Sequence, residues 1–186
     1  MSKSVYLLGV DPGLANMGWS VLQLLPDLEV LVDCGVRRTE KSNAKRKVLA
    51  SDDNLRRARE MAAELDRVFN RFPISVVCAE SMSFPRNSSA AAKMAMCWGS
   101  LATFVQLRNL PIVQSSPQEV KKVLCGNKSA SKEEIGAAVR NRYGNAEKLL
   151  EAVTPSVREH AYDSVAAVVA TLENSEVIRA LRSMAA

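Results

Sequence analysis

Two short apolar runs that end directly at an acidic residue restrict the possible folds of this chain. Residues Val5–Val10 are almost continuously apolar and lead into Asp11-Pro12-Gly13, a strong turn signal. Residues Ile74–Ala79 repeat the pattern and are followed by Glu80. Such runs are typical of strands buried on both faces, as in a sheet that helices cover on each side. The chain is therefore expected to be an α/β protein.

The remaining patterns predict the order β-β-β-α-β-α-β-α-α-α-α. Pro26-Asp27 separates two strand-like runs and predicts a hairpin. A long amphipathic helix is expected from Asn54 onward, capped by Asp52 or Asp53. The expected strands are Val5–Val10, Trp19–Leu25, Glu29–Arg37, Ile74–Ala79 and Pro111–Gln114, and further helices are expected to begin at Asn87 or Ser88, Ser116, Ser131, Ser156 and after Asn174.

Capping signals locate several helix starts. Ser116-Pro117 places a serine before a proline at the first helical position, and Ser131-Lys-Glu-Glu134 is a capping box. Ser156 is expected to cap a later helix. On the long helix, Leu55 begins the series of apolar residues expected to face the core. The charged residues expected to face away from the core are Arg56, Arg57, Arg59 and Glu60.

Length and composition predict one domain over residues 1–186. Apolar residues make up 47% of the chain and charged residues 24%, which excludes a disordered or wholly membrane-embedded chain. Four scattered cysteines without a C-x-x-C pair, beside a single histidine, are expected to be reduced core thiols. No segment approaches the ~20 apolar residues of a membrane span, and no signal peptide is evident. A cytoplasmic location without a membrane partner is expected.

The charge balance favours an anionic partner. The 25 Lys and Arg residues exceed the 20 Asp and Glu residues, which gives a net charge of +5. Residues Arg37–Lys47 form a basic connection with few apolar side chains. A polyanion such as nucleic acid is therefore a reasonable partner.

Four side chains could form a metal site. If the strands before Asp11 and Glu80 are parallel neighbours, both carboxylates emerge at the carboxyl edge of the sheet, where like charges need a cation between them. His160 and Asp163 are three residues apart in the first turns of a predicted helix and project from one face. Taken singly, a turn aspartate and a histidine near a helix start have ordinary structural explanations. Together the four form a site for hard divalent cations of the kind used in phosphodiester hydrolysis.

Six motifs occur in order over nearly the whole chain. They are Gly9-Val-Asp-Pro-Gly-Leu-Ala-Asn-Met-Gly18, Cys78-Ala-Glu80, Asn87-x5-Lys93-x5-Gly99, Val120-Lys-Lys122, Gly126-x5-Lys132 and His160-x-x-Asp163. This ordered set resembles the RuvC Holliday junction resolvases. The resemblance implies an RNase H-like fold, a five-stranded mixed sheet flanked by helices. It also implies a homodimer that makes paired symmetric nicks in a four-way DNA junction, often beside a branch-migration helicase.

The resemblance also implies a catalytic and metal-binding set: Asp11, Glu80, His160 and Asp163. The implied cofactor is two Mg²⁺ ions per active site, with Asp11 shared between them, and Mn²⁺ is able to substitute. Cleavage with these ions would leave 5′-phosphate and 3′-hydroxyl ends. Many relatives carry aspartate where this chain has His160, which could ligate a metal or orient the attacking water.

DNA contacts are implied for a second set: Lys121, Lys132, Lys122, Arg86, Phe84, Asn87 and Lys93. The family position for a stacking aromatic falls on Ser83, one residue before Phe84. The Ala- and Met-rich helix from Asn87 to Arg108 resembles the family's dimer helix, and a core helix is its ordinary interpretation.

Other functions remain open at this stage. An RNase H-like or YqgF-like nuclease acting on RNA or hybrids would use the same residues, and a junction-binding protein without catalysis would not need them. Asp11-x-Gly13-x4-Gly18 also resembles the first phosphate loop of sugar kinases and actin-like ATPases. Those proteins are much longer and need a second Gly-rich loop, which is not found here.

Overall fold

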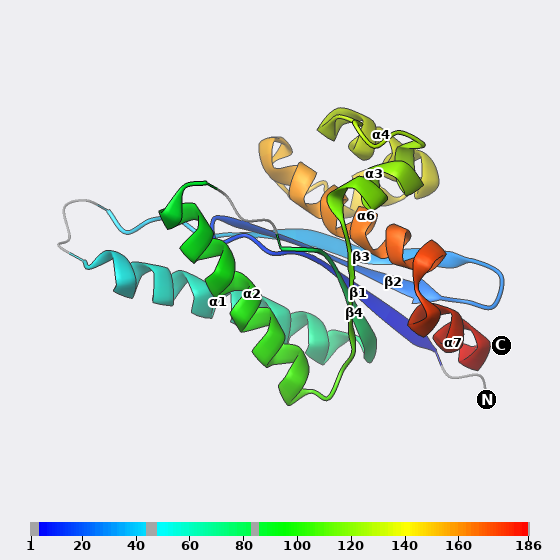
Figure 1. Cartoon of the computed structure of the whole chain (residues 1–186), viewed down its shortest axis with the longest axis horizontal. Coiled ribbons are helices and arrows are strands. Elements are labelled where there is room, and N and C mark those ends of the chain that lie inside the picture. Colours follow the sequence, from blue (N-terminus) through cyan, green and yellow to red (C-terminus); the bar gives the residue numbers. More distant parts are fainter. Residues whose placement is uncertain (1–3, 44–47, 83–85, 186) are drawn as a thin grey trace.

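A five-stranded sheet lies between two layers of helices in the computed structural model, which describes residues 4–43, 48–82 and 86–185 (Figure 1). The strand order is β3-β2-β1-β4-β5. The strands are β1 (Val5–Asp11), β2 (Asn16–Leu24), β3 (Glu29–Arg38), β4 (Ile74–Glu80) and β5 (Ile112–Ser115). The helices are α1 (Ala50–Arg71), α2 (Ser88–Leu107), α3 (Pro117–Cys125), α4 (Lys132–Arg142), α5 (Ala146–Leu149), the 3₁₀ turn η1 (Pro155–Val157), α6 (Arg158–Asn174) and α7 (Glu176–Ala185).

The sheet is mixed, as expected. Strands β1, β2 and β3 pair antiparallel, whereas β1, β4 and β5 pair parallel. Val10 lies opposite Ala79 in the parallel pair. Both strands therefore end at the same edge of the sheet, and the next residues in each are Asp11 and Glu80. The expectation that these two carboxylates emerge from neighbouring strand ends is confirmed.

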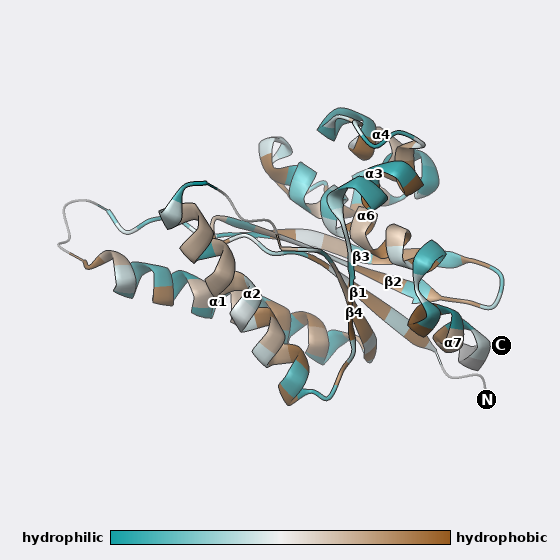
Figure 2. Cartoon of the chain, viewed as in Figure 1, coloured by the Kyte–Doolittle hydropathy of each residue, from teal (hydrophilic) through white to brown (hydrophobic). Residues whose placement is uncertain are grey.

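The central strands bury side chains on both faces of the sheet. Leu7 belongs to the core beneath α6, and its neighbour Leu8 belongs to the core beneath α1 and α2, because successive side chains of a strand point to opposite faces. Leu65 of α1 and Leu101 of α2 complete the second core. In Figure 2 helices α3 and α4 carry many hydrophilic residues. Burial on both faces explains why the strand sequences are continuously apolar.

Two glycines allow α6 to lie close against the sheet. A Cβ atom at Gly9 of β1 would collide with the carbonyl oxygen of Ser164, and one at Gly18 of β2 would collide with that of His160. Both carbonyls belong to the first half of α6. The missing side chains thus set how closely the start of α6 approaches the ends of β1 and β2.

Three predicted helix caps are confirmed and two are wrong. Asn87, Ser116 and Ser131 cap their helices with their side chains. Helix α1 begins at Ala50, ahead of the predicted Asp52 or Asp53 cap, and Asp53 instead accepts hydrogen bonds from Ser42. The Ser156 cap is wrong because a 3₁₀ turn contains this residue and α6 begins two residues later, at Arg158. The short α5 and η1 were not predicted.

The outward orientation predicted for Arg57 is also wrong. Its side chain is only 4% exposed, whereas Leu55, predicted to face the core, is 59% exposed. Arg57 donates hydrogen bonds to the Thr39 hydroxyl and the Leu14 carbonyl. Polar partners in the loops above the sheet therefore draw this cation inward. Arg56 and Arg59 are exposed as expected, and Glu60 is half-buried.

The cysteines are unpaired. Cys34 and Cys78 are buried, as expected of core thiols, and burial raises the pKa of each to about 12. Cys97 and Cys125 are only half-buried. Within the described ranges, no helix has the length and apolar character needed to cross a membrane.

Candidate active site

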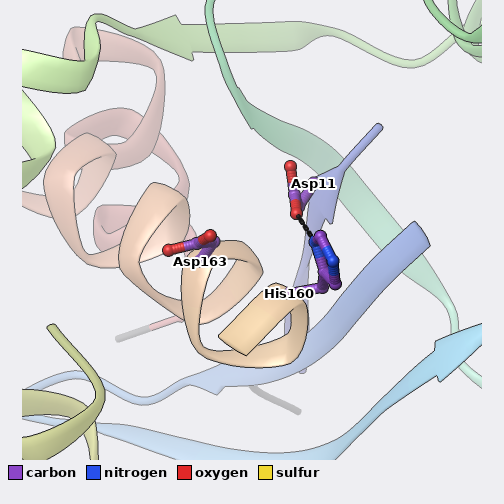
Figure 3. A group of neighbouring side chains, drawn as sticks. All are labelled: Asp11, His160 and Asp163. Carbon is purple, nitrogen blue, oxygen red and sulfur yellow. Dashed lines mark hydrogen bonds and ion pairs between the residues drawn. The ribbon is translucent and has the colours of Figure 1, made fainter. Parts of the chain in front are cut away.

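Asp11 and His160 face each other from the end of β1 and the first turn of α6 (Figure 3). The Asp11 Oδ2 and His160 Nδ1 atoms are 2.8 Å apart, and each side chain is 27% exposed. Because an ionised carboxylate only accepts hydrogen bonds, Nδ1 carries the proton. The pair is accessible from solvent and still partly screened from it.

Asp163 follows one turn further along α6 and completes a group of three. Ligand atoms of Asp11, His160 and Asp163 all lie within 4.8 Å of one another. One cation could touch all three side chains. The i, i+3 spacing on α6 and the strand end of β1 thus produce the arrangement that the sequence predicted for these residues.

Glu80 lies at the neighbouring strand end but outside that group of three. Burial raises the pKa of its carboxyl, and the negative charges of Asp163 and Asp11 raise it further. Lys132 and Lys121 act in the opposite direction. Glu80 is therefore close enough to interact electrostatically with both aspartates.

The acidic groups are crowded and already attract a cation. Burial raises the pKa of Asp163, although the hydrogen bond and charge of Lys132 oppose the shift. The Lys132 ammonium forms an ion pair with Asp163 Oδ2. The hydrogen bond with Asp11 raises the pKa of His160 against the effect of burial. These carboxylates would be stabilised by a divalent cation, and the lysine ammonium now supplies part of that charge.

Asn16 is a site residue that sequence reasoning missed. Its Nδ2 atom lies 3.2 Å from His160 Nε2, so both ring nitrogens have partners. With Nδ1 protonated toward Asp11, Nε2 accepts from the Asn16 amide. Asn16 opens β2 immediately after the turn that follows Asp11. The only sequence signal was its place in the motif between Gly9 and Gly18, which does not indicate a contact with residue 160.

The predicted DNA-binding residues separate into two groups. Lys132 contacts the site directly, the half-buried Lys121 influences Glu80 electrostatically, and Lys93 lines a groove together with His160. The remaining residues show no contact with the site in the part of the chain that the structure describes. Arg86 and Lys122 are exposed, Asn87 uses its side-chain oxygen to cap α2 at the Ala90 N–H, and Phe84, with Ser83, lies outside the described residues.

Comparison with known proteins gives a consistent result. The family model described as "Crossover junction endodeoxyribonuclease RuvC" matches residues 7–171. A protein of that description from Natranaerobius thermophilus is 29% identical over 134 residues, covering 72% of this chain and 78% of the relative. One from a Synechococcus species is 26% identical over 160 residues, covering 86% and 93%.

Solved structures show the same architecture. The structure of Thermus thermophilus RuvC superposes with a TM-score of 0.70 at 24% identity, covering 92% of this chain and 96% of the other. The same protein "in complex with Holliday junction substrate" also gives 0.70, at 22% identity and the same coverage. The five-stranded mixed sheet flanked by helices is thus the RNase H-like fold, as expected.

Proposed function

The chain belongs to the RuvC family of crossover junction endodeoxyribonucleases, and on this basis we propose that it resolves four-way DNA junctions by paired, symmetric nicks. The observation that carries the proposal is the meeting of Asp11, His160 and Asp163 at one sheet edge. We assign the catalytic role to these three residues together with Glu80. Residues 1–186 act as one nuclease domain in this proposal.

The donor set fits divalent cations. Carboxylate oxygens are the preferred ligands of Mg²⁺ and also suit Mn²⁺. Burial, together with the charge of neighbouring carboxylates, raises the pKa values of Glu80 and Asp163. Asp11, His160 and Asp163 would hold one Mg²⁺ ion, and Asp11 with Glu80 a second, with Mn²⁺ as a substitute. When bound, such ions lower the barrier to attack of water on phosphorus and stabilise the departing oxygen.

The protein's own residues have distinct tasks in this proposal. Asn16 and Asp11 hold the His160 ring through its two nitrogens in the metal-free protein. For His160 to ligate an ion through Nδ1, the Nδ1 proton must leave, and Nε2 would then carry the ring proton and donate it to the Asn16 side-chain oxygen after the amide turns over. Lys132 exchanges its ion pair with Asp163 for a DNA phosphate, and Lys121, whose charge also acts on Glu80, assists it. The products are a 5′-phosphate and a 3′-hydroxyl.

A homodimer would supply the second cut. Helix α2 exposes Ala92, Ala95 and Gly99, so another helix could approach it closely, and much of α2 is hydrophobic (Figure 2). A two-fold dimer through α2 would present two equal sites to a two-fold junction. Delivery of the junction by a branch-migration helicase is proposed from the family relationship alone.

The test is cleavage of an end-labelled four-way DNA junction in Mg²⁺, beside a linear duplex and an RNA–DNA hybrid. We expect nicks in the junction only, and their loss in Asp11→Asn. Asp27→Asn, at the exposed β2–β3 turn, is the matched control and should cut normally. Cleavage of the hybrid alone would favour the ribonuclease alternative. A junction that is bound but uncut in both Mg²⁺ and Mn²⁺ would leave only a binding role.

A further inference from the structure

Arg57 is a buried cation without an anionic partner. Its side chain is 4% exposed, and its Nε and Nη2 atoms donate to the Thr39 hydroxyl at 2.8 Å and the Leu14 carbonyl at 3.1 Å. Both acceptors are neutral. Among the described residues no ion pair involves Arg57, and the residues outside the described ranges, which are 1–3, 44–47, 83–85 and 186, include no Asp or Glu. A buried charge is costly unless it is paired, so this guanidinium can accept an anion.

Arg57 also lines a groove that reaches the proposed catalytic site. This groove encloses about 300 Å³ between the Gly13–Asn16 loop and the first turns of α2, and Lys41, Lys93 and His160 are among its other lining residues. The buried arginine therefore lies next to a space that is open to a ligand. His160 connects that space to the catalytic group.

A second groove of about 440 Å³ continues the first. The two share Ala15, Asn16, Lys41 and Arg57 among their lining residues. We call their union the Arg57 channel. It runs from the start of α2, past the β1–β2 loop, to Ser156 before α6.

The Arg57 channel is predominantly basic. Its charged lining residues other than His160 are Arg38, Lys41, Arg57, Lys93 and Glu40. Glu40 is paired at 3.7 Å with Arg38, and both of these side chains are largely exposed. The cations thus exceed the carboxylates, which favours a polyanion over a neutral or cationic ligand.

Cations lie on both flanks of the catalytic group. Lys132 pairs with Asp163, whereas the Arg57 channel borders His160. A DNA strand crossing the site would place phosphates near each flank. We propose that the Arg57 channel binds phosphodiester groups next to the scissile one, with Arg57 neutralised by a phosphate. This proposal rests on the proposed function, since it assumes a DNA strand at the site.

The alternative is that Arg57 only holds the Leu14 carbonyl and Thr39 in place. The salt dependence of junction binding separates the phosphate-binding role from this structural role. Each lost phosphate contact reduces the magnitude of the slope of log affinity against log salt concentration by about 1. A purely structural role would weaken binding and lower the unfolding temperature without a matching change of slope.

The experiment measures junction affinity against salt in Mg²⁺, with Asp11→Asn as the common background to prevent cutting. We expect Arg57→Met and Lys93→Met each to lower the slope by about 1, and Arg57→Lys to keep it. Arg59→Met, which removes the same charge from the exposed face of α1, is the matched control and should leave the slope unchanged. A slope for Arg57→Met equal to that of Arg59→Met would overturn the proposal.

A second measurement decides the question if Arg57→Met fails to fold. Single phosphates near the crossover are replaced by uncharged methylphosphonates. The affinity of each substituted junction is then measured for the protein with Lys93 and for the Lys93→Met variant. At one phosphate position, the replacement should weaken junction binding by the protein with Lys93 but not by Lys93→Met. If no phosphate position behaves in this way, the proposal is overturned. Failure to bind any junction would instead refute the proposed function, whereas junction cleavage with unchanged slopes would refute only the channel.

Discussion

The single histidine of the chain is a direct probe of the proposed site. In the metal-free protein, the hydrogen bond with Asp11 raises the pKa of His160 above the ordinary 6.5. We expect an NMR titration of the imidazole to show this increase, and Asp11→Asn to lower the pKa again. Asp27→Asn should leave it unchanged. An unshifted titration in the parent protein would contradict the observed Asp11–His160 contact.

The same contact predicts how stability changes with pH. Because the pKa of His160 is higher in the folded protein, its protonation stabilises the fold. This contribution is fully present at pH values below the unfolded pKa of about 6.5. That contribution is lost as the pH rises through the pKa of folded His160. Thermal unfolding of the metal-free protein should therefore show a loss of stability as the pH rises above about 6.5, and this loss should be smaller in Asp11→Asn. Equal pH profiles for the two proteins would contradict this linkage.

Lys132 is expected to compete with divalent cations for Asp163. Its side chain is 58% exposed and that of Asp163 is 11% exposed, so the ion pair contributes at most about 1 kcal/mol. Lys132→Met should thus bind Mn²⁺ up to roughly fivefold more tightly without DNA, as measured by paramagnetic resonance. Lys128→Met, another exposed lysine nearby in sequence, should leave the affinity unchanged. Weaker Mn²⁺ binding by Lys132→Met would contradict this competition.

Contact between β2 and α6 positions His160. Since a Cβ at Gly18 would collide with the His160 carbonyl, Gly18→Ala must displace the first turn of α6 or strain β2. We expect a loss of about 1–3 kcal/mol in unfolding free energy and a larger loss of junction cleavage. Gly144→Ala, with open space around the new Cβ, should change neither. Wild-type cleavage by Gly18→Ala would show that this close approach is not needed.

Strand ends and helix spacing made much of the site predictable. The apolar runs before Asp11 and Glu80 indicated neighbouring strands, and three-residue spacing indicated one helical face for His160 and Asp163. Contacts between distant segments could not be predicted. Asn16 meets His160 because α6 lies close against the sheet, and Lys132 meets Asp163 because the start of α4 lies beside α6.

Helix α1 shows a second limit of the sequence patterns. Apolar spacing indicated the helix, but it assigned Arg57 to the solvent face together with Arg56, Arg59 and Glu60. Arg57 is buried because polar groups of the Leu14 loop and Thr39 lie above the start of α1. Apolar periodicity contains no information about such partners.

Assembly through α2 is testable in solution. Ala95→Glu places a charge on the exposed face of α2 and should convert a dimer into a monomer in sedimentation velocity experiments. Ala63→Glu adds the same charge to an exposed position of α1 and should remain a dimer. A monomeric parent protein, or a dimeric Ala95→Glu protein, would rule out α2 as the interface.

Paired cutting by a two-fold assembly is best tested on a supercoiled plasmid that extrudes a cruciform. Two nicks within one bound complex release a linear plasmid, whereas independent nicks release nicked circles first. In Mg²⁺ the protein should give mainly linear plasmid, and Asp11→Asn should give none. Nicked circles as the main product, or equal cutting of a plasmid without the cruciform, would contradict a dimeric junction resolvase.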